Sequence, residues 1–363
     1  MRSLVFLALL FASYANGEVN ASKGQIRDLQ NQIDALIAIL DLRPPAVFDY
    51  DCNASSADDD QQAIQQLLDA SVPGDVFLIS GQCTRITLKV SQDNISIIGD
   101  VDGTTKLIGL GNPIDQYGNA SEAVILADGK GIVLENLTLT AEGHGLRLLA
   151  PGTVIGKKIF ANGNMDSGFL VTGVLACEDC RANLNPRRGV TNVSNGSIIL
   201  CGNFEAKDNV EVGLGVFTGS KVEFGRATCR SSFGIDRAST IELSGNRVGL
   251  SIVSRGSINA GDETDFVINN NSGPGFYIAQ NSSVLMSYSN LWVSSNGARS
   301  MVLENSTASI KVNGIELKDG VWVTDFGILS LDGPDVDKVD VWCGGEAIVK
   351  IKDGIGASRV CGD

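Results

Sequence analysis

One short pattern recurs through the middle of the chain and constrains its fold more than any other feature. The pattern is a glycine, an apolar residue, any residue and a second apolar residue, then a small polar turn and another apolar residue. Eight segments follow it, one of them with serine in place of glycine: GLRLLAPGTV at 145, GFLVTGVLAC at 168, GVTNVSNGSI at 189, GVFTGSKV at 215, GIDRASTI at 234, GLSIVSRGSI at 249, GFYIAQNSSV at 275 and SMVLENSTASI at 300. Their starts lie 15 to 26 residues apart. Self-similarity at such an interval is typical of a solenoid.

Within each segment the apolar residues alternate, as they do in strands, and Gly, Asn and Ser separate the segments, as they do in turns. The chain has 42 glycines without a collagen period, and its 43% hydrophobic content is too high for a disordered chain. The uneven interval excludes a stereotyped repeat such as a leucine-rich repeat, but it suits a parallel β-helix, whose loops vary while its strands stay stacked. We therefore expect an all-β fold of about 12 coils.

A single amphipathic helix is expected, over residues 58–70, before the first strand. Acidic residues open it, Ala63, Ile64, Leu67 and Leu68 share one face, and Pro73 with Gly74 ends it. The open end of a β-solenoid exposes apolar core and unpaired strand edges, so this helix is predicted to cover the first coil. No helix is expected after Gly74.

Three features follow one another in this region: a group of acidic residues, then AIQQLLDA, then GDVFLISG. This order resembles the entry segment of the pectate-lyase-like superfamily, which includes phage tailspike depolymerases and other polysaccharide-active proteins. The resemblance covers this helix motif and, loosely, the repeat to about residue 345. It implies a right-handed single-stranded parallel β-helix over residues 46–345, with residues 346–363 as a C-terminal cap or tail. It is specific for the fold and says little about activity.

The N-terminus predicts export. Residues 1–17 combine Arg2, an apolar run and small residues at S-x-A spacing, as in a secretory signal peptide. The mature protein is then expected to be secreted, to the extracellular space or the periplasm, with no membrane span. Residues 18–45 are expected to form a helical segment and a proline linker, and residues 24–43 have the apolar spacing of a short coiled coil. This helix either forms a homo-oligomer or packs back on the solenoid, and a mass measurement with and without residues 18–43 would distinguish the two.

Eight cysteines follow the predicted signal peptide, and an even number in an exported protein favours disulfides. They are Cys52, Cys83, Cys177, Cys180, Cys201, Cys229, Cys343 and Cys361. Cys52 with Cys83 would link the helix to the first coil, and Cys343 with Cys361 would tie down the tail. Among the other four, Cys201 lies one coil length from both Cys177 and Cys180, so it could bridge to either, and Cys229 would take a remaining partner. The CEDC motif lacks the second cysteine pair of a zinc finger and the helical context of a redox site, so disulfides are favoured.

The net charge of −14 argues against nucleic acid and anionic membrane surfaces as partners. The charge is uneven, however. Residues 147–255 hold 13 Lys and Arg against 9 Asp and Glu. An anionic ligand, such as an acidic polysaccharide, should therefore bind in the middle of the chain.

Candidate binding residues come from strand alternation. If the apolar residues of each segment face inward, the residue between them faces outward, and stacked coils align these residues in a row. The row reads Arg147, Leu170, Thr191, Phe217, Asp236, Ser251, Tyr277, Val302, and the predicted turn beside it holds Arg187 and Arg188. Aromatic rings stack on sugars, arginine pairs with carboxylates and Asp binds hydroxyls, so we expect Arg147, Arg187, Arg188, Phe217, Asp236 and Tyr277 to bind substrate. The alternative is that any outward face carries such a mixture.

Signals for catalysis and for cofactors are weak. The lone histidine, His144, stands in a GHG like that of polygalacturonases, but the other motifs of that family are missing and its strand parity predicts a buried side chain. No facing carboxylate pair is visible for hydrolysis, and no lyase signature surrounds the basic residues. The acidic segment at 332–340 lacks the spacing of a calcium loop, so no cofactor is expected, with calcium as the alternative. A polysaccharide lyase or hydrolase, a non-catalytic carbohydrate binder or adhesin, and a structural surface protein all remain possible.

Overall fold

The computed structural model describes residues 44–52, 57–109, 123–233, 238–261 and 263–352. The predicted signal peptide, the heptad segment 24–43 and most of the tail, including Cys361, lie outside these residues. From Ala46 onward the chain forms one compact unit.

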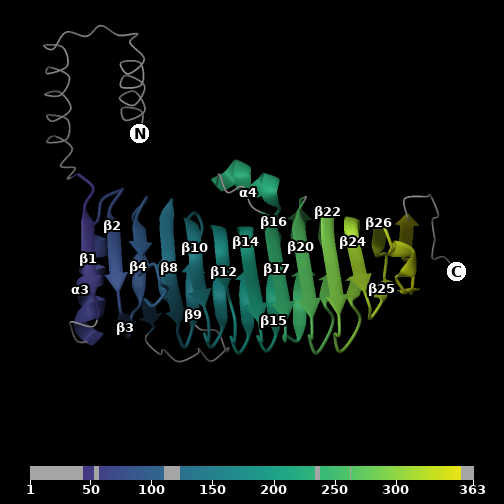
Figure 1. The fold of residues 1–363 in the computed structure, drawn as a ribbon, viewed down its shortest axis with the longest axis horizontal. Coiled ribbons are helices and arrows are strands. Elements are labelled where there is room, and N and C mark those ends of the chain that lie inside the picture. The colour runs from purple at the N-terminus through teal and green to yellow at the C-terminus, as the bar shows by residue number, and fades with distance from the viewer. Residues whose placement is uncertain (1–43, 53–56, 110–122, 234–237, 262, 353–363) are drawn as a thin grey trace, which may run out of the picture. The chain divides into compact units, whose positions relative to one another are not determined.

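This unit is a parallel β-solenoid, in which each strand pairs in parallel with the equivalent strand of the next coil (Figure 1). One sheet has eleven strands, one for each turn, and we call it the eleven-stranded sheet. Its strands are β4 (Leu88–Val90), β7 (Ala123–Ala127), β9 (His144–Leu148), β11 (Ser167–Val171), β13 (Arg188–Asn192), β15 (Val212–Phe217), β18 (Val248–Val253), β21 (Phe276–Ala279), β23 (Met301–Glu304), β25 (Val321–Thr324) and β27 (Val341–Cys343). The stacked coils confirm the predicted all-β parallel β-solenoid, with eleven turns in place of the expected twelve coils.

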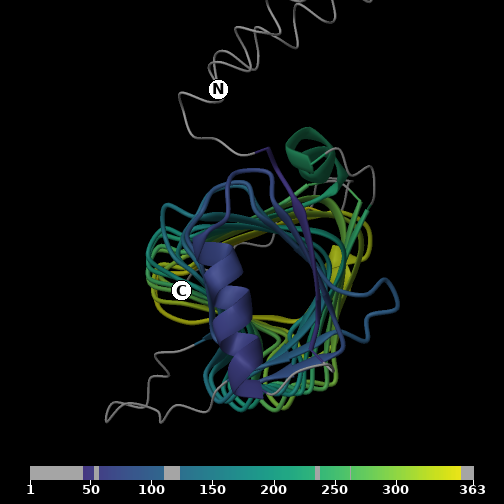
Figure 2. The ribbon, with the colours of Figure 1, turned by 90° about the vertical axis from the view of Figure 1, so that its left-hand side faces the viewer.

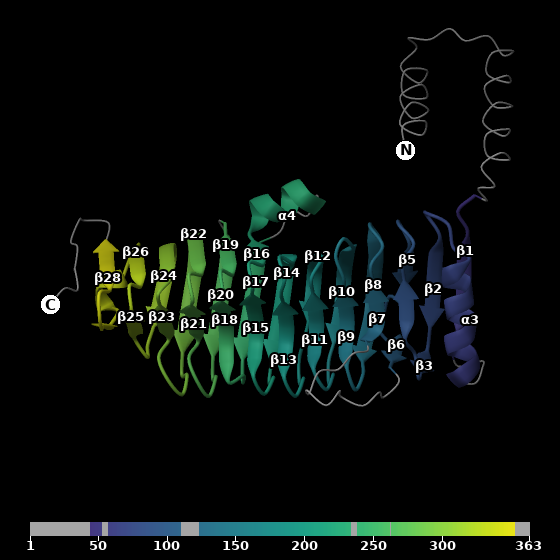
Figure 3. The same cartoon turned by 180° about the vertical axis from the view of Figure 1, so that it is seen from behind.

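The remaining strands form a seventeen-stranded sheet that wraps the other sides of the coils (Figure 3). They are β1 (Val47–Asp51), β2 (Val76–Ser80), β3 (Gln82–Thr84), β5 (Ser96–Ile98), β6 (Lys106–Ile108), β8 (Ile132–Thr140), β10 (Thr153–Ala161), β12 (Val174–Arg181), β14 (Ser197–Lys207), β16 (Lys221–Phe224), β17 (Ser239–Ser244), β19 (Ser257–Ala260), β20 (Thr264–Asn269), β22 (Ser283–Ser294), β24 (Thr307–Leu317), β26 (Ile328–Asp332) and β28 (Ile348–Lys352). Several of these strands are long because they bend between two sides of a coil; β14, for example, pairs with β16 along one part and with β17 along the other.

The core is a single column of apolar side chains inside the coils. In the eleven-stranded sheet the inward residues align from coil to coil and are at most 2% exposed. They are Leu146, Phe169, Val190, Leu214, Leu250, Phe276 and Met301. Alternation therefore places the intervening residues on the outer surface.

Asparagine side chains stack just before the eleven-stranded sheet, in the turn that leads into it. The Nδ2 of each buried asparagine donates to the Oδ1 of the next, from Asn164 through Asn185, Asn209, Asn246 and Asn271 to Asn296, at 2.9 to 3.2 Å. The same Oδ1 atoms also accept the backbone N–H of the preceding asparagine, for example at 2.8 Å between Asn164 N and Asn185 Oδ1. This asparagine ladder satisfies buried turn donors that water cannot reach.

Glycines stack beside the ladder, where the chain enters each strand. A Cβ built on Gly168, Gly189, Gly213 or Gly249 would lie 2.5 to 2.8 Å from the carbonyl oxygen of the glycine one coil further on. Real Cβ atoms do not approach so closely. The glycine that opens the sequence pattern is therefore required by the close stacking of the coils.

Helix α3 (Ala57–Asp69) crosses the end of the first coil (Figure 2). Its Ile64 and Leu68 are at most 3% exposed and belong to the core. The side-chain amides of Gln61 and Gln65 pair with both backbone groups of Thr87 and Lys89, at 2.6 to 3.1 Å. These contacts occupy the outer edge of β4, the first strand of its sheet.

The prediction that no helix follows Gly74 is wrong. Helix α4 (Arg226–Phe233) lies between β16 and β17 and stands outside the stack of strands (Figures 1 and 3). Its Cys229 forms a disulfide with Cys201 of β14, and both lie in a small apolar cluster with Ile199. The repeat segment GIDRASTI therefore supplies no strand of the eleven-stranded sheet, and its last residues, from Ser239, belong to β17 of the other sheet.

The Cys52–Cys83 disulfide is present as predicted, whereas the bridges proposed between Cys201 and Cys177 or Cys180 are wrong. Cys177 and Cys180 bond to each other within β12. Both belong to the inner core, while Cys201 pairs in register with Glu178 and faces outward. Cys201 therefore lies on the opposite side of the sheet from Cys177 and Cys180 and cannot form a disulfide with either. Cys343 is also disulfide-bonded, but the prediction for Cys361 falls outside the described residues.

Among the helices within the described ranges, none combines the length and apolarity that crossing a bilayer requires.

Candidate functional site: the outward face of the eleven-stranded sheet

The outward residues of the eleven-stranded sheet align in register over eleven coils, and we call this alignment the outer row. It consists of Lys89, Leu126, Arg147, Leu170, Thr191, Gly215, Ser251, Tyr277, Val302, Trp322 and Trp342. Six of the eight residues that the sequence predicted for the row belong to it.

Two predicted members do not occupy the row. Gly215 pairs with both Thr191 and Ser251, so Phe217 lies two residues further along β15, opposite Val253. The register also leaves no strand position for Asp236, because Gly215 pairs directly with Ser251, and Asp236 falls outside the described residues. Phe217 still reaches the row, because its ring lies where a side chain on Gly215 would be.

A cluster of charged residues borders the N-terminal half of the outer row. The Arg187 guanidinium lies 3.3 Å from Asp166 Oδ2 and 3.4 Å from Glu211 Oε1, and Arg188 Nε lies 3.2 Å from Glu211 Oε2. Arg188 also lies over the Phe217 ring, with 5.1 Å between its Cζ and the ring centroid. The predicted residues Arg187, Arg188 and Phe217 thus meet at one place, held by two acids that the sequence did not single out.

The middle of the outer row is made of small residues. Thr191, Gly215 and Ser251 are each buried, and the row of glycines lies directly beside them. The Thr191 hydroxyl lies 3.0 Å from the Ser167 hydroxyl of the preceding coil. The Phe217 ring covers Gly215, so the middle of the outer row presents this ring together with the small residues Thr191 and Ser251.

Aromatic side chains occupy the C-terminal end of the outer row. Trp322 and Trp342 are register neighbours and are 48% and 42% exposed. The Trp342 ring lies over Gly320, where a Cβ would clash with it, and Arg299 stacks on the same ring with 3.9 Å from its Cζ to the ring centroid. The sequence signal for Trp322 was present, because GVWV at Gly320 has the repeat pattern.

Tyr277 forms the clearest acid–base pair on this face. Its hydroxyl donates a hydrogen bond to Glu304 Oε2 at 2.9 Å, from β21 to the next coil. Burial, and then this hydrogen bond to the negative Glu304, raise the pKa of Tyr277 above its usual 10.0. The phenol therefore keeps its proton to a higher pH than an ordinary tyrosine, and it is positioned as a hydrogen-bond donor to Glu304.

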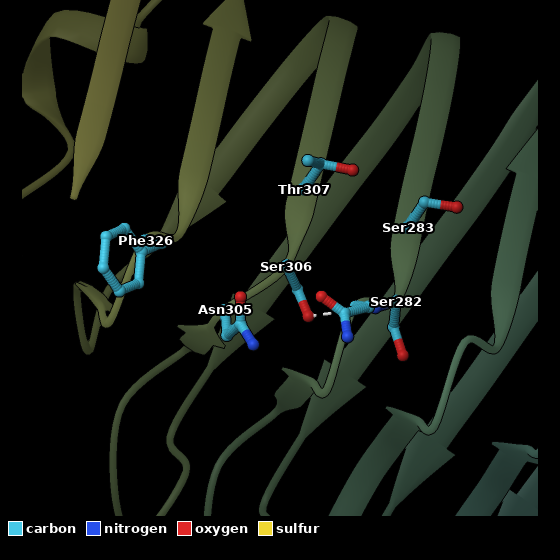
Figure 4. Close-up of a pocket in the computed structure, with 7 residues that line it drawn as sticks. Ser282, Ser283, Asn305, Ser306, Thr307 and Phe326 are labelled. Atoms are coloured by element: carbon cyan, nitrogen blue, oxygen red, sulfur yellow. Dashed lines mark hydrogen bonds between the residues drawn. The ribbon is translucent and has the colours of Figure 1, made fainter. Parts of the chain in front are cut away.

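An open hollow of about 230 Å³ lies where the chain leaves the eleven-stranded sheet (Figure 4). It is lined by Asn281, Ser282, Ser283, Asn305, Ser306, Thr307 and Phe326. Hydroxyl and amide groups dominate this lining, and the Ser306 hydroxyl accepts a hydrogen bond from the Ser282 N–H. No ionisable side chain is among these residues, so the hollow can hold a polar ligand but cannot supply a general acid or base.

His144 is 3% exposed, as its strand parity predicted, and faces away from the outer row. Within the part of the chain that the structure describes, no three His, Cys, Asp or Glu side chains gather closely enough to hold a metal ion. In the acidic segment 332–340, Lys338 pairs with Asp335.

A scan against protein-family models finds no match for this chain, and a search of the curated proteins also finds none. Two solved structures that resemble it are the A-module of a mannuronan C-5 epimerase from Azotobacter vinelandii and an alginate lyase from a Paenibacillus species. The epimerase module is 15% identical, with a TM-score of 0.42 over 85% of this chain and 100% of its own. The lyase is 12% identical, with a TM-score of 0.36 over 86% of this chain and 99% of its own.

Proposed function

We propose that this protein is secreted and binds an acidic extracellular polysaccharide along the outer row. The observation that supports this best is the alignment, on one face, of Arg147, the small residues Thr191, Gly215 and Ser251, and the aromatic rings of Tyr277, Trp322 and Trp342. An extended polymer that lies parallel to the stack would meet one side chain per coil.

The chemistry of the row suits a sugar chain. Exposed tryptophan rings stack on the apolar faces of sugars, and their N–H group reaches polar atoms at the edge. Guanidinium groups bind carboxylates in a fork geometry. Arg188 and Arg299 are each held against an aromatic ring, so their planes are already oriented before a ligand arrives.

Charge favours an acidic polymer over a neutral one. Arg147, Arg187 and Arg188 outnumber Asp166 and Glu211 along the N-terminal half of the face, within the region where basic residues exceed acidic ones. The net charge of the whole chain is strongly negative. This local excess would attract a polyanion to one face only, and added salt would weaken the attraction.

Cleavage by β-elimination is a second candidate function, favoured by the Tyr277–Glu304 pair. In such a reaction a base removes the proton at C5 of a uronate, the C4–O bond breaks, a C4=C5 double bond forms and an acid protonates the departing O4. Glu304 could accept the first proton and Tyr277 could donate the second. Unsaturated ends appearing in a polyuronate, and their loss in Tyr277→Phe, would support cleavage; retention without new ends would leave binding alone.

The binding proposal is tested with immobilised polyuronates. Trp322→Ala combined with Trp342→Ala should weaken retention at least about tenfold, because truncated aromatic contacts in an interface commonly cost more than 1 kcal/mol. Leu285→Ala on β22 is the control, since Leu285 is similarly exposed (47%) but belongs to the other sheet. Equal retention of the double variant and the control would overturn the proposal.

A further inference from the structure

A second hollow, larger than the first, lies on the outward face of the seventeen-stranded sheet. It measures about 410 Å³, within the range of small-molecule sites. Its lining residues come from strands β22 and β24 and from the 3₁₀ turn η1 (Val336–Lys338) with the residues beside it. The residues that line it are Trp292, Gly314, Ile315, Glu316, Leu317, Lys318, Asp335, Lys338 and Val339.

The hollow has one aromatic wall. Trp292 is 36% exposed and pairs in register with Glu316 of the next coil, so the two outward side chains are neighbours. The half-buried Ile315 adds apolar surface to the lining. A partly exposed indole beside a few polar groups is the combination that small-molecule sites use to fix an amphipathic ligand.

The charges around the hollow cancel in pairs. Lys318 Nζ lies 2.7 Å from Glu316 Oε1, and Lys338 pairs with Asp335. The hydrogen bond to Glu316 raises the pKa of Lys318, so the pair stays charged to a higher pH than an unpaired lysine would. The lining therefore offers fixed donors and acceptors without a net charge, unlike the basic half of the outer row.

We propose that this hollow is a second carbohydrate site, which binds a neutral sugar unit of a polysaccharide. The Trp292 ring would stack on the apolar face of the sugar, and the two ion pairs would bond its hydroxyls. A polyuronate gains no net attraction from a charge-balanced lining and would lose hydration of its carboxylates, so selectivity should favour uncharged glycans. The inference does not rest on the function of the outer row, because the two sites lie on different sheets and differ in charge.

The test is a titration of the full chain with neutral hexasaccharides of glucose, xylose and mannose, followed by calorimetry. Trp292→Ala should weaken the binding of at least one of them by at least about tenfold. Trp292→Phe should restore part of the affinity, and Leu285→Ala is the control that leaves it unchanged, because Leu285 is exposed (47%) on the same strand β22 but does not line the hollow. The affinity should also hardly change with salt, since no net charge is involved.

The outcomes separate the two sites. Loss of neutral-sugar binding in Trp292→Ala, with unchanged retention on polyuronates, supports the second site whatever the result for the outer row. If none of the three hexasaccharides binds, or if Trp292→Ala binds them as the unmodified chain does, the inference is wrong. If Trp292→Ala instead loses polyuronate retention, the hollow selects acidic polymers and the argument from charge fails.

Discussion

At the scale of single residues, the asparagines of the ladder link each coil of this solenoid to the next through hydrogen bonds. Each carries hydrogen bonds to the coils on both sides, and each is at most 1% exposed from Asn164 to Asn271. Four of them stand four residues before a glycine of the stacked row, and Asn246 stands three before. The asparagines of the ladder therefore recur at a fixed place in the sequence. The repeat pattern of apolar residues starts at the glycine, however, and does not include the polar residue that precedes it.

We predict that Asn209→Ala destabilises the protein by about 2 to 4 kcal/mol. The change removes the acceptor of the Asn185 N–H and Nδ2 groups, at 3.0 and 2.9 Å, and leaves both donors buried. Equilibrium unfolding in urea measures the loss. Asn259→Ala is the control, since Asn259 is exposed on β19, and an equal effect of the two changes would contradict the role of the ladder.

Tyr277 predicts a pH dependence of stability. Its pKa is raised in the folded state, so the folded protein holds this proton more tightly than the unfolded chain does. The stabilisation is complete below the unfolded value of 10.0 and is lost as pH rises through the higher folded value. Urea midpoints measured between about pH 9 and 12 should fall more steeply for the unmodified chain than for Tyr277→Phe. Parallel curves would exclude this linkage.

At the scale of elements, the sequence predicted the strands well and the insertion badly. Apolar alternation fixed which residues face inward, because each strand buries every second side chain. The segment at Gly234 has the same pattern by composition, yet the coil passes from Gly215 directly to Ser251. Helix α4 lies outside the coil, and its Cys229 forms a disulfide with Cys201. The residues around these two cysteines carry no pattern that predicts this contact. Phe217 was misplaced by two residues because Gly215 was taken as the first residue of the pattern.

The disulfides should contribute unequally to stability. The Cys201–Cys229 bond spans 28 residues, whereas Cys177–Cys180 spans 3. On the chain-entropy model, replacing the first pair by serines should cost about 3.5 kcal/mol and replacing the second about 1.5 kcal/mol. Unfolding in urea gives both values. Protease cleavage near α4 should appear in the first variant alone, and equal costs for the two variants would contradict the model.

Helix α3 is predicted to block association at the first coil. Gln61 and Gln65 occupy the edge of β4, so the double variant Gln61→Ala/Gln65→Ala should free that edge to pair with another chain. We expect oligomers by light scattering at concentrations where Gln62→Ala/Gln66→Ala stays unchanged, since Gln62 and Gln66 are exposed. If the first variant scatters light no more than the second, these amides do not protect the edge.

At the scale of the whole described unit, one scaffold presents different chemistry on different sides. The eleven-stranded sheet offers a basic and aromatic row, while the seventeen-stranded sheet offers a charge-balanced hollow around Trp292. All three tryptophans of the chain lie on these outward surfaces and not in the core. Burying a large aromatic ring stabilises a fold, so a ring that stays exposed to water does not contribute in this way. Exposed rings of this kind indicate binding surfaces. The resemblance of the entry motif implied the β-helix scaffold. It did not predict the positions of these rings, because outward-facing residues do not determine how the coils stack and can differ between proteins of the same fold.

The central claim is that an acidic polymer lies along the outer row, and hydroxyl-radical footprinting tests it directly. In the presence of a polyuronate oligomer, oxidation of Trp322, Trp342 and Tyr277 should fall, while oxidation of Tyr288 on β22 should not change. Undiminished oxidation of both outer-row tryptophans under conditions where the oligomer is bound would contradict the account.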